Sequence, residues 1–175
     1  FPDLYKTYYS LPSFTWGKTL GGGNPISQDN RDPLLGKFAG ADGLKTGHTE
    51  EAGYGFTGSA KQGNRRLVMV LAGLGSTGQR IDESVKFMNW GFRAWQAKQI
   101  VAKGKLVETA EVQLGSANHV GLVAPDNLSV TLPGGATPEL QARVVYEGPI
   151  KAPIKAGDHI ADLIVTTPDM QPQRV

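Results

Sequence analysis

A change in the spacing of apolar residues near residue 100 constrains the fold of this 175-residue chain more than any other feature. Before it, one group of apolar residues recurs at spacings of four, three, four and three: Ile81, Val85, Met88, Phe92 and Trp95. Residues spaced in this way form one stripe along a helix, which predicts a helix over 79–98 that covers a sheet. Beyond residue 105, apolar residues alternate with polar ones, as in half-buried strands. We therefore expect an α+β chain divided into a first part, 1–98, and a β-rich second part, 99–175.

The predicted helix has signals at both ends. Ser76 or Thr77 can act as its N-cap, because either hydroxyl can accept a hydrogen bond from an unpaired backbone N–H of the first turn. Lys98 lies near the other end, where the helix dipole favours a cation.

The rest of the first part is predicted to be a sheet and a connector. Residues 52–61 and 65–73 flank the short turn Gln62-Gly63-Asn64, which predicts an antiparallel hairpin beside the strand that carries Lys45. Residues 1–37 are rich in proline and glycine, which indicates an irregular connector with short extended pieces.

The second part is predicted to be a small antiparallel sandwich. Five segments have strand character and are separated by turns rich in proline, glycine and aspartate: 107–114, 119–124, 128–132, 140–147 and 159–166.

Composition excludes several classes of protein. The formal charge of +2 comes from scattered basic residues, so we expect no nucleic-acid partner. No apolar run approaches the length of a membrane span, and the chain has no cysteine. His119 and His159 have no companion at metal-ligand spacing, so we expect neither a metal nor another cofactor.

The run from Ala41 to Thr49 contains Lys45-Thr46-Gly47, one of three signatures of the serine acyl-transfer enzymes that bind penicillin. It is followed by a glycine-rich stretch over 50–60, by Gly78-Gln79-Arg80 and by Trp90-Gly91-Phe92-Arg93. Together these segments resemble the low-molecular-mass penicillin-binding proteins, which are D-alanyl-D-alanine carboxypeptidases. The resemblance is specific from Phe1 to about Trp95 and looser beyond. It implies the C-terminal part of a penicillin-binding, β-lactamase-like transpeptidase domain, followed by a small all-β sandwich domain.

The two other signatures of the family are not found in their usual places. No serine has a lysine three positions later, so the Ser-x-x-Lys nucleophile is absent. The one Ser-x-Asn, Ser116-Ala117-Asn118, lies after Lys-Thr-Gly and not before it, and we interpret it as a coincidental turn. We therefore expect this chain to be the C-terminal part of an enzyme whose nucleophile is on an upstream fragment. Alone it should be inactive and expose sheet edges.

The resemblance assigns roles to four consecutive residues. The Lys45 ammonium would face the catalytic groove and attract a peptide carboxylate, and the Thr46 hydroxyl would donate to the same carboxylate. Gly47 would let the substrate approach the strand backbone. The backbone N–H of His48 would be one of two oxyanion donors. The His48 imidazole could act as a base or simply shape the groove, and the sequence favours the second role.

Arg80 is a further candidate for binding the substrate carboxylate. It lies in the predicted first helical turn, where the dipole disfavours a cation, so another interaction should offset that cost. In the resembling enzymes the arginine here helps to bind the carboxylate, and a planar guanidinium suits bidentate recognition. The alternative is an ordinary surface arginine. One departure from the family is Asp32, which replaces the second amide of the usual Asn-x-Asn-x-Leu-Leu.

The resemblance implies a serine-type D-Ala-D-Ala carboxypeptidase that acts on peptidoglycan pentapeptide stems through an acyl-enzyme and is trapped by β-lactams. It also implies an extracytoplasmic location, at the periplasmic face of the cytoplasmic membrane, and leaves membrane attachment undetermined. Two alternatives stay open. A β-lactamase shares the Lys-Thr-Gly strand but lacks a β-rich extension, and a non-catalytic wall-binding or assembly module would explain the missing Ser-x-x-Lys.

Overall fold

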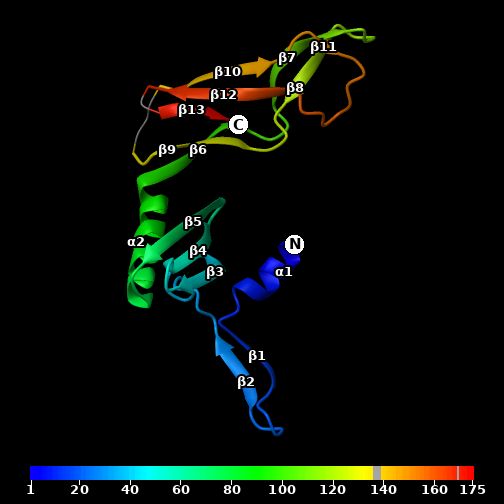
Figure 1. Cartoon of the computed structure of the whole chain (residues 1–175). Helices are drawn as coiled ribbons and strands as arrows, with labels where there is room; N and C mark the ends of the chain where they lie inside the picture. The colour runs from blue at the N-terminus through cyan, green and yellow to red at the C-terminus, as the bar shows by residue number, and fades with distance from the viewer. Residues whose placement is uncertain (136–138, 169) are drawn as a thin grey trace. The chain divides into compact units, whose positions relative to one another are not determined.

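The computed structural model describes residues 1–135, 139–168 and 170–175 (Figure 1). Its contacts divide the chain into two compact units, Phe1–Ala94 and Trp95–Val175. In the described residues no helix is both long enough and apolar enough to cross a membrane.

The first unit is built on an antiparallel sheet with the strand order β3-β4-β5. Its strands are β3 (Ala41–Thr49), β4 (Gly53–Gln62) and β5 (Arg65–Leu74). The β4–β5 turn is made by Gly63 and Asn64, and Gly63 has a φ of 58°, which glycine adopts without the steric cost that other residues incur. The predicted hairpin beside the Lys45 strand is confirmed.

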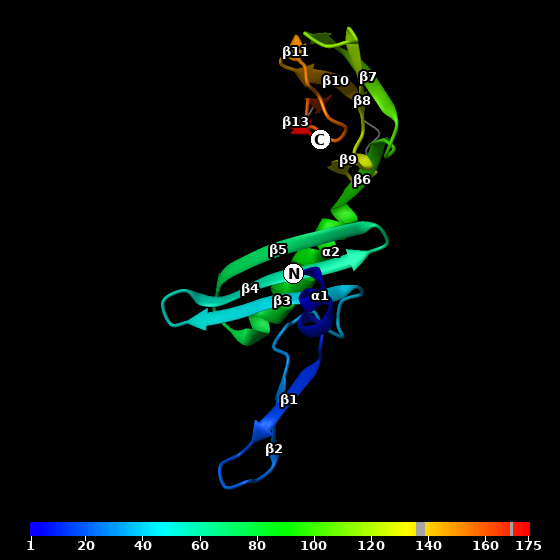
Figure 2. The ribbon, with the colours of Figure 1, turned by 90° about the vertical axis from the view of Figure 1, so that its right-hand side faces the viewer.

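One face of the sheet packs against α2 (Thr77–Ala94), which lies behind the strands in Figure 2. Met88 of the helix is buried in the core of this unit together with four residues from the sheet and the loop before it: Leu34, Phe56, Ala60 and Met69. The helix begins as predicted. Ser76 is the N-cap, since its Oγ accepts from the N–H of Gln79 at 3.0 Å and its carbonyl accepts from the N–H of Arg80 at 3.0 Å.

The predicted end of this helix is wrong. The helix stops at Ala94, and Trp95 and Lys98 belong to strand β6 (Trp95–Val101). β6 pairs with β9 (Leu128–Pro133), with Lys98 opposite Val130. A strand far along the chain supplies hydrogen-bond partners to this segment, and that pairing overrides the helical spacing that Trp95 happened to continue.

The prediction for residues 1–37 is correct for the extended pieces and misses a helix. The extended pieces are β1 (Ser13–Lys18) and β2 (Pro25–Asp29), which form an antiparallel hairpin. Before them, α1 (Pro2–Leu4) continues into the wider helical turns of η1 (Tyr5–Tyr9). A helix this short is marginal alone and depends on tertiary contacts.

Those contacts lie on the face of the sheet opposite α2. A Cβ added to Gly43 of β3 would lie 3.2 Å from Cβ of Tyr9, so glycine allows the N-terminal helix to pack closely on the strand. The Tyr5 hydroxyl donates to Asp42 Oδ1 at 2.5 Å, and Arg66 of β5 donates to both oxygens of the same carboxylate, at 2.8 and 2.7 Å. Burial alone would raise the pKa of Asp42, but hydrogen bonds from Arg66, Tyr5 and Ser59 together hold it below its usual value. This network fixes the start of β3.

The second unit contains three small sheets (Figure 1). β6 pairs with β9. A second sheet has the order β10 (Gln141–Tyr146), β12 (Ala161–Thr167), β13 (Met170–Arg174), and a third has the order β11 (Ile150–Lys151), β7 (Leu106–Gln113), β8 (His119–Val123). The core consists of residues from β9 and β12: Val130, Leu132, Leu163 and Val165.

All five strands predicted for this unit are present, although their ends differ by a few residues. His159 lies outside β12, in an exposed position where Nε2 is 3.4 Å from Asp162 Oδ1. β6, β11 and β13 were not predicted, and the expectation of a purely antiparallel unit is wrong because β11 runs parallel to β7. A two-residue strand is too short to show a period in the sequence. The α+β class, with a β-rich second unit, is confirmed.

Candidate functional site

The Lys-Thr-Gly motif lies on β3, at one edge of the sheet. In the part of the chain that the structure describes, β3 pairs with β4 and no strand pairs with its other edge. Thr46 is opposite Phe56 and His48 is opposite Tyr54. Because Phe56 is in the core beneath α2, and cross-strand partners share a face, Thr46 and His48 belong to the α2 face and Lys45 to the opposite face.

A hollow of about 250 Å³ lies beside this edge. It is lined by three residues of β3 and by the segment that ends β2 and follows it: Leu44, Lys45 and Thr46, with Gln28, Asp29, Asn30, Arg31 and Asp32. Lys45 is exposed, and its Nζ donates to the carbonyl of Thr46. The hollow therefore has a cation and a hydroxyl beside an unpaired strand edge.

Arg31 is a second cation in the lining of this hollow, and sequence reasoning missed it. Arg31 occupies the variable position between the two amide positions of Asn-x-Asn-x-Leu-Leu, so the family pattern does not mark it. The sequence does indicate that Arg31 is exposed, because a basic side chain between two turn-forming residues is held at the surface of a loop.

Asp32 is buried in the same lining, with only 9% of its surface exposed. Its Oδ1 accepts from the N–H of Leu34 at 2.7 Å, and its own N–H donates to Asn30 Oδ1 at 2.9 Å. Its Oδ2 has no hydrogen-bond partner among the described residues. Burial raises the pKa of Asp32, the charge of Asp42 adds to this effect, and backbone hydrogen bonds from Leu34 and Leu35 oppose it.

Replacing Asp32 with asparagine should stabilise the protein at pH 7 by about 1 kcal/mol. A carboxyl whose pKa is raised by folding contributes its full stability below the unfolded value of about 3.9 and loses it as the pH rises through the folded value. Asparagine has the same shape and no such loss. Denaturant unfolding at pH 4 and pH 7 should therefore show a gain that is clearly larger at the higher pH.

The exposed neighbour Asp29 provides the matched control, and Asp29→Asn should leave stability unchanged at both pH values. A gain of equal size at pH 4 and pH 7 in Asp32→Asn would show that the carboxyl charge is not the cause.

A second cluster lies on the α2 face of the sheet. The ring centroids of His48 and Tyr54 are 4.0 Å apart, and Arg80 Cζ lies 5.6 Å from the centroid of Tyr54. Arg80 is only 7% exposed, and its Nε has no hydrogen-bond partner among the described residues. This burial contradicts the alternative of a surface arginine. Arg80 does not line the Lys45 hollow, but it shares the sheet face of Thr46 and His48.

The described residues contain no group of three or more His, Cys, Asp or Glu side chains placed to hold a metal ion. The chemistry available at this site is that of hydrogen-bond donors and fixed positive charge along a strand edge.

Comparison with known proteins identifies the family. The sequence model of D-alanyl-D-alanine carboxypeptidases matches residues 2–75, and that of the C-terminal domain of penicillin-binding protein 5 matches residues 95–170. The chain belongs to the D-alanyl-D-alanine carboxypeptidase family. The matched segments correspond to the sheet with its motif strand and to the β-rich unit, so the resemblance found in the sequence is confirmed.

The chain is also similar in sequence and in structure to individual members of the family. The chain is 34% identical over 172 residues to the D-alanyl-D-alanine carboxypeptidase DacD of Escherichia coli K12, and the match covers 97% of this chain and 42% of that protein. Penicillin binding protein 5 from Haemophilus influenzae superposes with a TM-score of 0.74 at 32% identity, over 99% of this chain and 49% of the other. Penicillin binding protein 6B from Escherichia coli gives a TM-score of 0.60 at 29% identity, over 100% and 44%. The chain thus spans less than half the length of these relatives.

Proposed function

We propose that this chain supplies the substrate-binding strand of a serine-type D-Ala-D-Ala carboxypeptidase that acts on peptidoglycan pentapeptide stems. One observation carries the proposal: in a member of this family, the Lys-Thr-Gly strand has an edge that no described strand pairs with, beside a hollow lined by Lys45 and Thr46. The nucleophile would come from a Ser-x-x-Lys segment outside these 175 residues.

The stem peptide would lie along β3 as an added strand and exchange main-chain hydrogen bonds with it. Gly47 has open space where a side chain would stand, so the peptide can approach closely. The terminal carboxylate would be bound from both sides of the strand, by the Lys45 ammonium on one face and by the Thr46 hydroxyl and the Arg80 guanidinium on the other.

The chemistry would proceed in two steps. The serine Oγ attacks the carbonyl carbon of the D-Ala–D-Ala bond while its proton passes to a base, and the negative charge on the carbonyl oxygen is stabilised by the N–H groups of His48 and the serine. The C–N bond then breaks, the leaving D-alanine amine takes a proton, and an acyl-enzyme remains. Water hydrolyses this ester and restores the serine hydroxyl. The His48 ring, packed on Tyr54, would shape the groove and take no proton.

The same acyl-enzyme explains how β-lactams would act on the enzyme, since they contain a reactive amide beside a carboxylate. Peptidoglycan stems lie outside the cytoplasm, so we place the enzyme in the periplasm. The match of residues 95–170 to the C-terminal domain of penicillin-binding protein 5 favours this function over that of a β-lactamase.

A fluorescent penicillin tests the proposal. A preparation that contains this chain together with the Ser-x-x-Lys segment should become covalently labelled, with the label on the serine and with unlabelled penicillin competing. Intact mass should show one adduct on the species that carries the serine. If no species is labelled while the serine segment is present and folded, the groove is vestigial and the non-catalytic module is the correct interpretation.

A further inference from the structure

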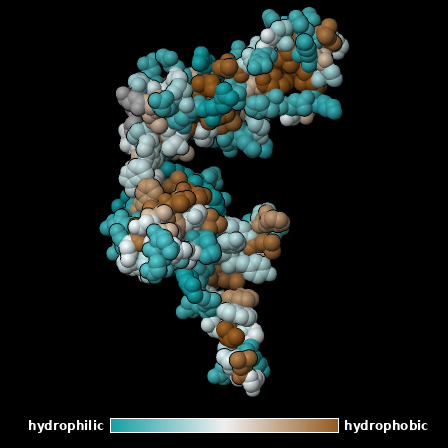
Figure 3. Space-filling model, viewed as in Figure 1, coloured by the Kyte–Doolittle hydropathy of each residue, from teal (hydrophilic) through white to brown (hydrophobic). Residues whose placement is uncertain are grey.

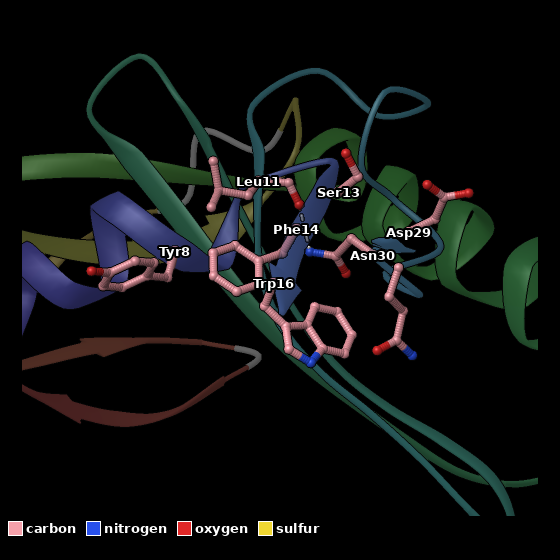
Figure 4. A pocket seen from close by; sticks show the side chains of 8 residues that line it. Tyr8, Leu11, Ser13, Phe14, Trp16, Asp29 and Asn30 are labelled. Carbon is pink, nitrogen blue, oxygen red and sulfur yellow. Dashed lines mark hydrogen bonds between the residues drawn. The ribbon is translucent and has the colours of Figure 1, made fainter. Parts of the chain in front are cut away.

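A second hollow, of about 340 Å³, lies next to the first on the β1–β2 hairpin (Figure 4). It is lined by Tyr8, Leu11, Ser13, Phe14, Trp16, Gln28, Asp29 and Asn30. Gln28, Asp29 and Asn30 line both hollows, so the two are contiguous. Its volume falls in the range of small-molecule sites.

One wall of this hollow is a pair of stacked aromatic rings. Phe14 and Trp16 are two residues apart on β1 and therefore lie on the same face of the hairpin. Their ring centroids are 6.0 Å apart, with an angle of 16° between the planes, and the residues are 54% and 43% exposed. Figure 3 shows apolar side chains reaching the surface along this hairpin. Exposed apolar surface of this kind marks a binding site when polar groups border it.

Amide and carboxylate groups line the same hollow as the rings. Gln28 is directly opposite Phe14 in the hairpin and shares its face, whereas Asp29, opposite Ser13, is on the other face but also lines the hollow. Asn30 has a structural role here, because its Nδ2 donates to the carbonyl of Tyr9 at 3.1 Å and to that of Leu11 at 3.0 Å, and so closes the base of the hairpin. The bond to Leu11 is drawn in Figure 4. Gln28 and Asp29 are exposed and can therefore bond to a ligand.

Flat rings beside amide and carboxylate groups match the chemistry of a sugar. A pyranose ring presents C–H groups on its face, which pack on the electron-rich faces of aromatic rings, and hydroxyl and acetamido groups at its rim, which bond to amides and carboxylates. A lipid surface fits less well, because the Asp29 carboxylate would be repelled by anionic headgroups and disfavoured near acyl chains.

We propose that this hollow binds the glycan strand of peptidoglycan, a β-1,4-linked chain of N-acetylated hexosamines, while an attached stem peptide occupies the adjacent Lys45 hollow. The inference deepens the proposed function and rests on it, since it takes the glycan-borne peptide as the substrate. A bound sugar would position the peptide along β3 and reduce the entropy lost on binding.

Titration with the N-acetylglucosamine tetramer, chitotetraose, tests this site without catalysis. The indole N–H signal of Trp16 in the NMR spectrum, assigned with Trp16→Phe, should shift saturably. Trp16→Ala and Phe14→Ala should each weaken binding about tenfold or more, from lost stacking and buried area. The control is Trp90→Ala. Trp90 stacks on Phe87 on the surface of α2, with centroids 5.5 Å apart, and neither residue lines the described hollows.

The outcomes separate the alternatives. No saturable shift of Trp16, or equal loss of binding in Trp90→Ala, would overturn the glycan site. A change of Trp16 fluorescence with phosphatidylglycerol vesicles, without any response to the sugar, would overturn it in favour of a membrane contact. Penicillin labelling does not involve the sugar, so labelling without sugar binding refutes the glycan site alone, whereas failed labelling refutes the proposed function.

Discussion

Replacing Lys45 with alanine in the enzyme that contains the nucleophile is expected to lower kcat/KM on a D-Ala-D-Ala peptide by about 100-fold or more. Lys45 lines the hollow beside the edge of β3 that no described strand pairs with, and no described acidic side chain forms an ion pair with its ammonium. Its charge is therefore available to the substrate carboxylate and to the charge that develops in the transition state. The rate of acylation by penicillin should fall as well, because a β-lactam carries the same carboxylate.

Two variants make this prediction specific. Lys45→Arg keeps the positive charge and should recover part of the lost activity. Recovery should be incomplete because the compact ammonium is replaced by a broader, planar guanidinium. Lys61→Ala removes an exposed lysine from β4 of the same sheet and should have no effect. Lys45 is exposed, so its removal should leave the thermal unfolding of the protein unchanged. Wild-type kcat/KM in Lys45→Ala would remove Lys45 from the site.

The sequence predicted those parts of the fold that local chemistry determines. The β4–β5 hairpin follows from alternating residues around a Gly-Asn turn, and Ser76 is the N-cap because its hydroxyl is in position to accept from the first turn. The helix over residues 2–9 was missed because its stability comes from Tyr5 and Tyr9 packing on β3, which no local pattern reveals. Trp95 was assigned to the helix because its spacing from Phe92 continues the helical stripe. The same residue can equally begin a strand, and only the pairing of β6 with β9 decides between helix and strand.

The candidate site likewise has some residues that local sequence places and others that only tertiary structure places. The motif located Lys45, Thr46, Gly47 and His48, because consecutive residues of one strand stay together whatever the rest of the chain does. Arg31 and Asp32 enter the site through the folding of a loop, so their proximity to Lys45 depends on tertiary structure. The burial of Arg80 was likewise unpredictable, since its neighbour Tyr54 is 26 residues earlier in the sequence.

The expected effect of Arg80→Ala is a fall in kcat/KM of about 30-fold on a peptide that ends in D-Ala-D-Ala. Arg80 is buried on the sheet face of Thr46, and its Nε has no described hydrogen-bond partner. A buried donor without a partner is costly unless a ligand satisfies it, and a carboxylate held by Thr46 would do so. Arg80→Lys should restore little, because lysine lacks both the planar fork and the flat surface that lies over Tyr54. Arg93→Ala, an exposed arginine at the end of the same helix, is the control and should be silent.

A substrate with a C-terminal amide distinguishes two roles of Arg80: binding the substrate carboxylate directly, or only holding Tyr54 in place. If Arg80 binds the carboxylate, the wild-type enzyme should prefer the acid over the amide, and Arg80→Ala should lose most of that preference by slowing only the acid. If Arg80 only holds Tyr54 against His48, both substrates should slow equally and the preference should persist. The second result would make Arg80 a positioning residue and leave carboxylate binding to Lys45 and Thr46. Unchanged kinetics on both substrates would exclude Arg80 from the reaction, and its burial would then reflect packing against Tyr54 alone.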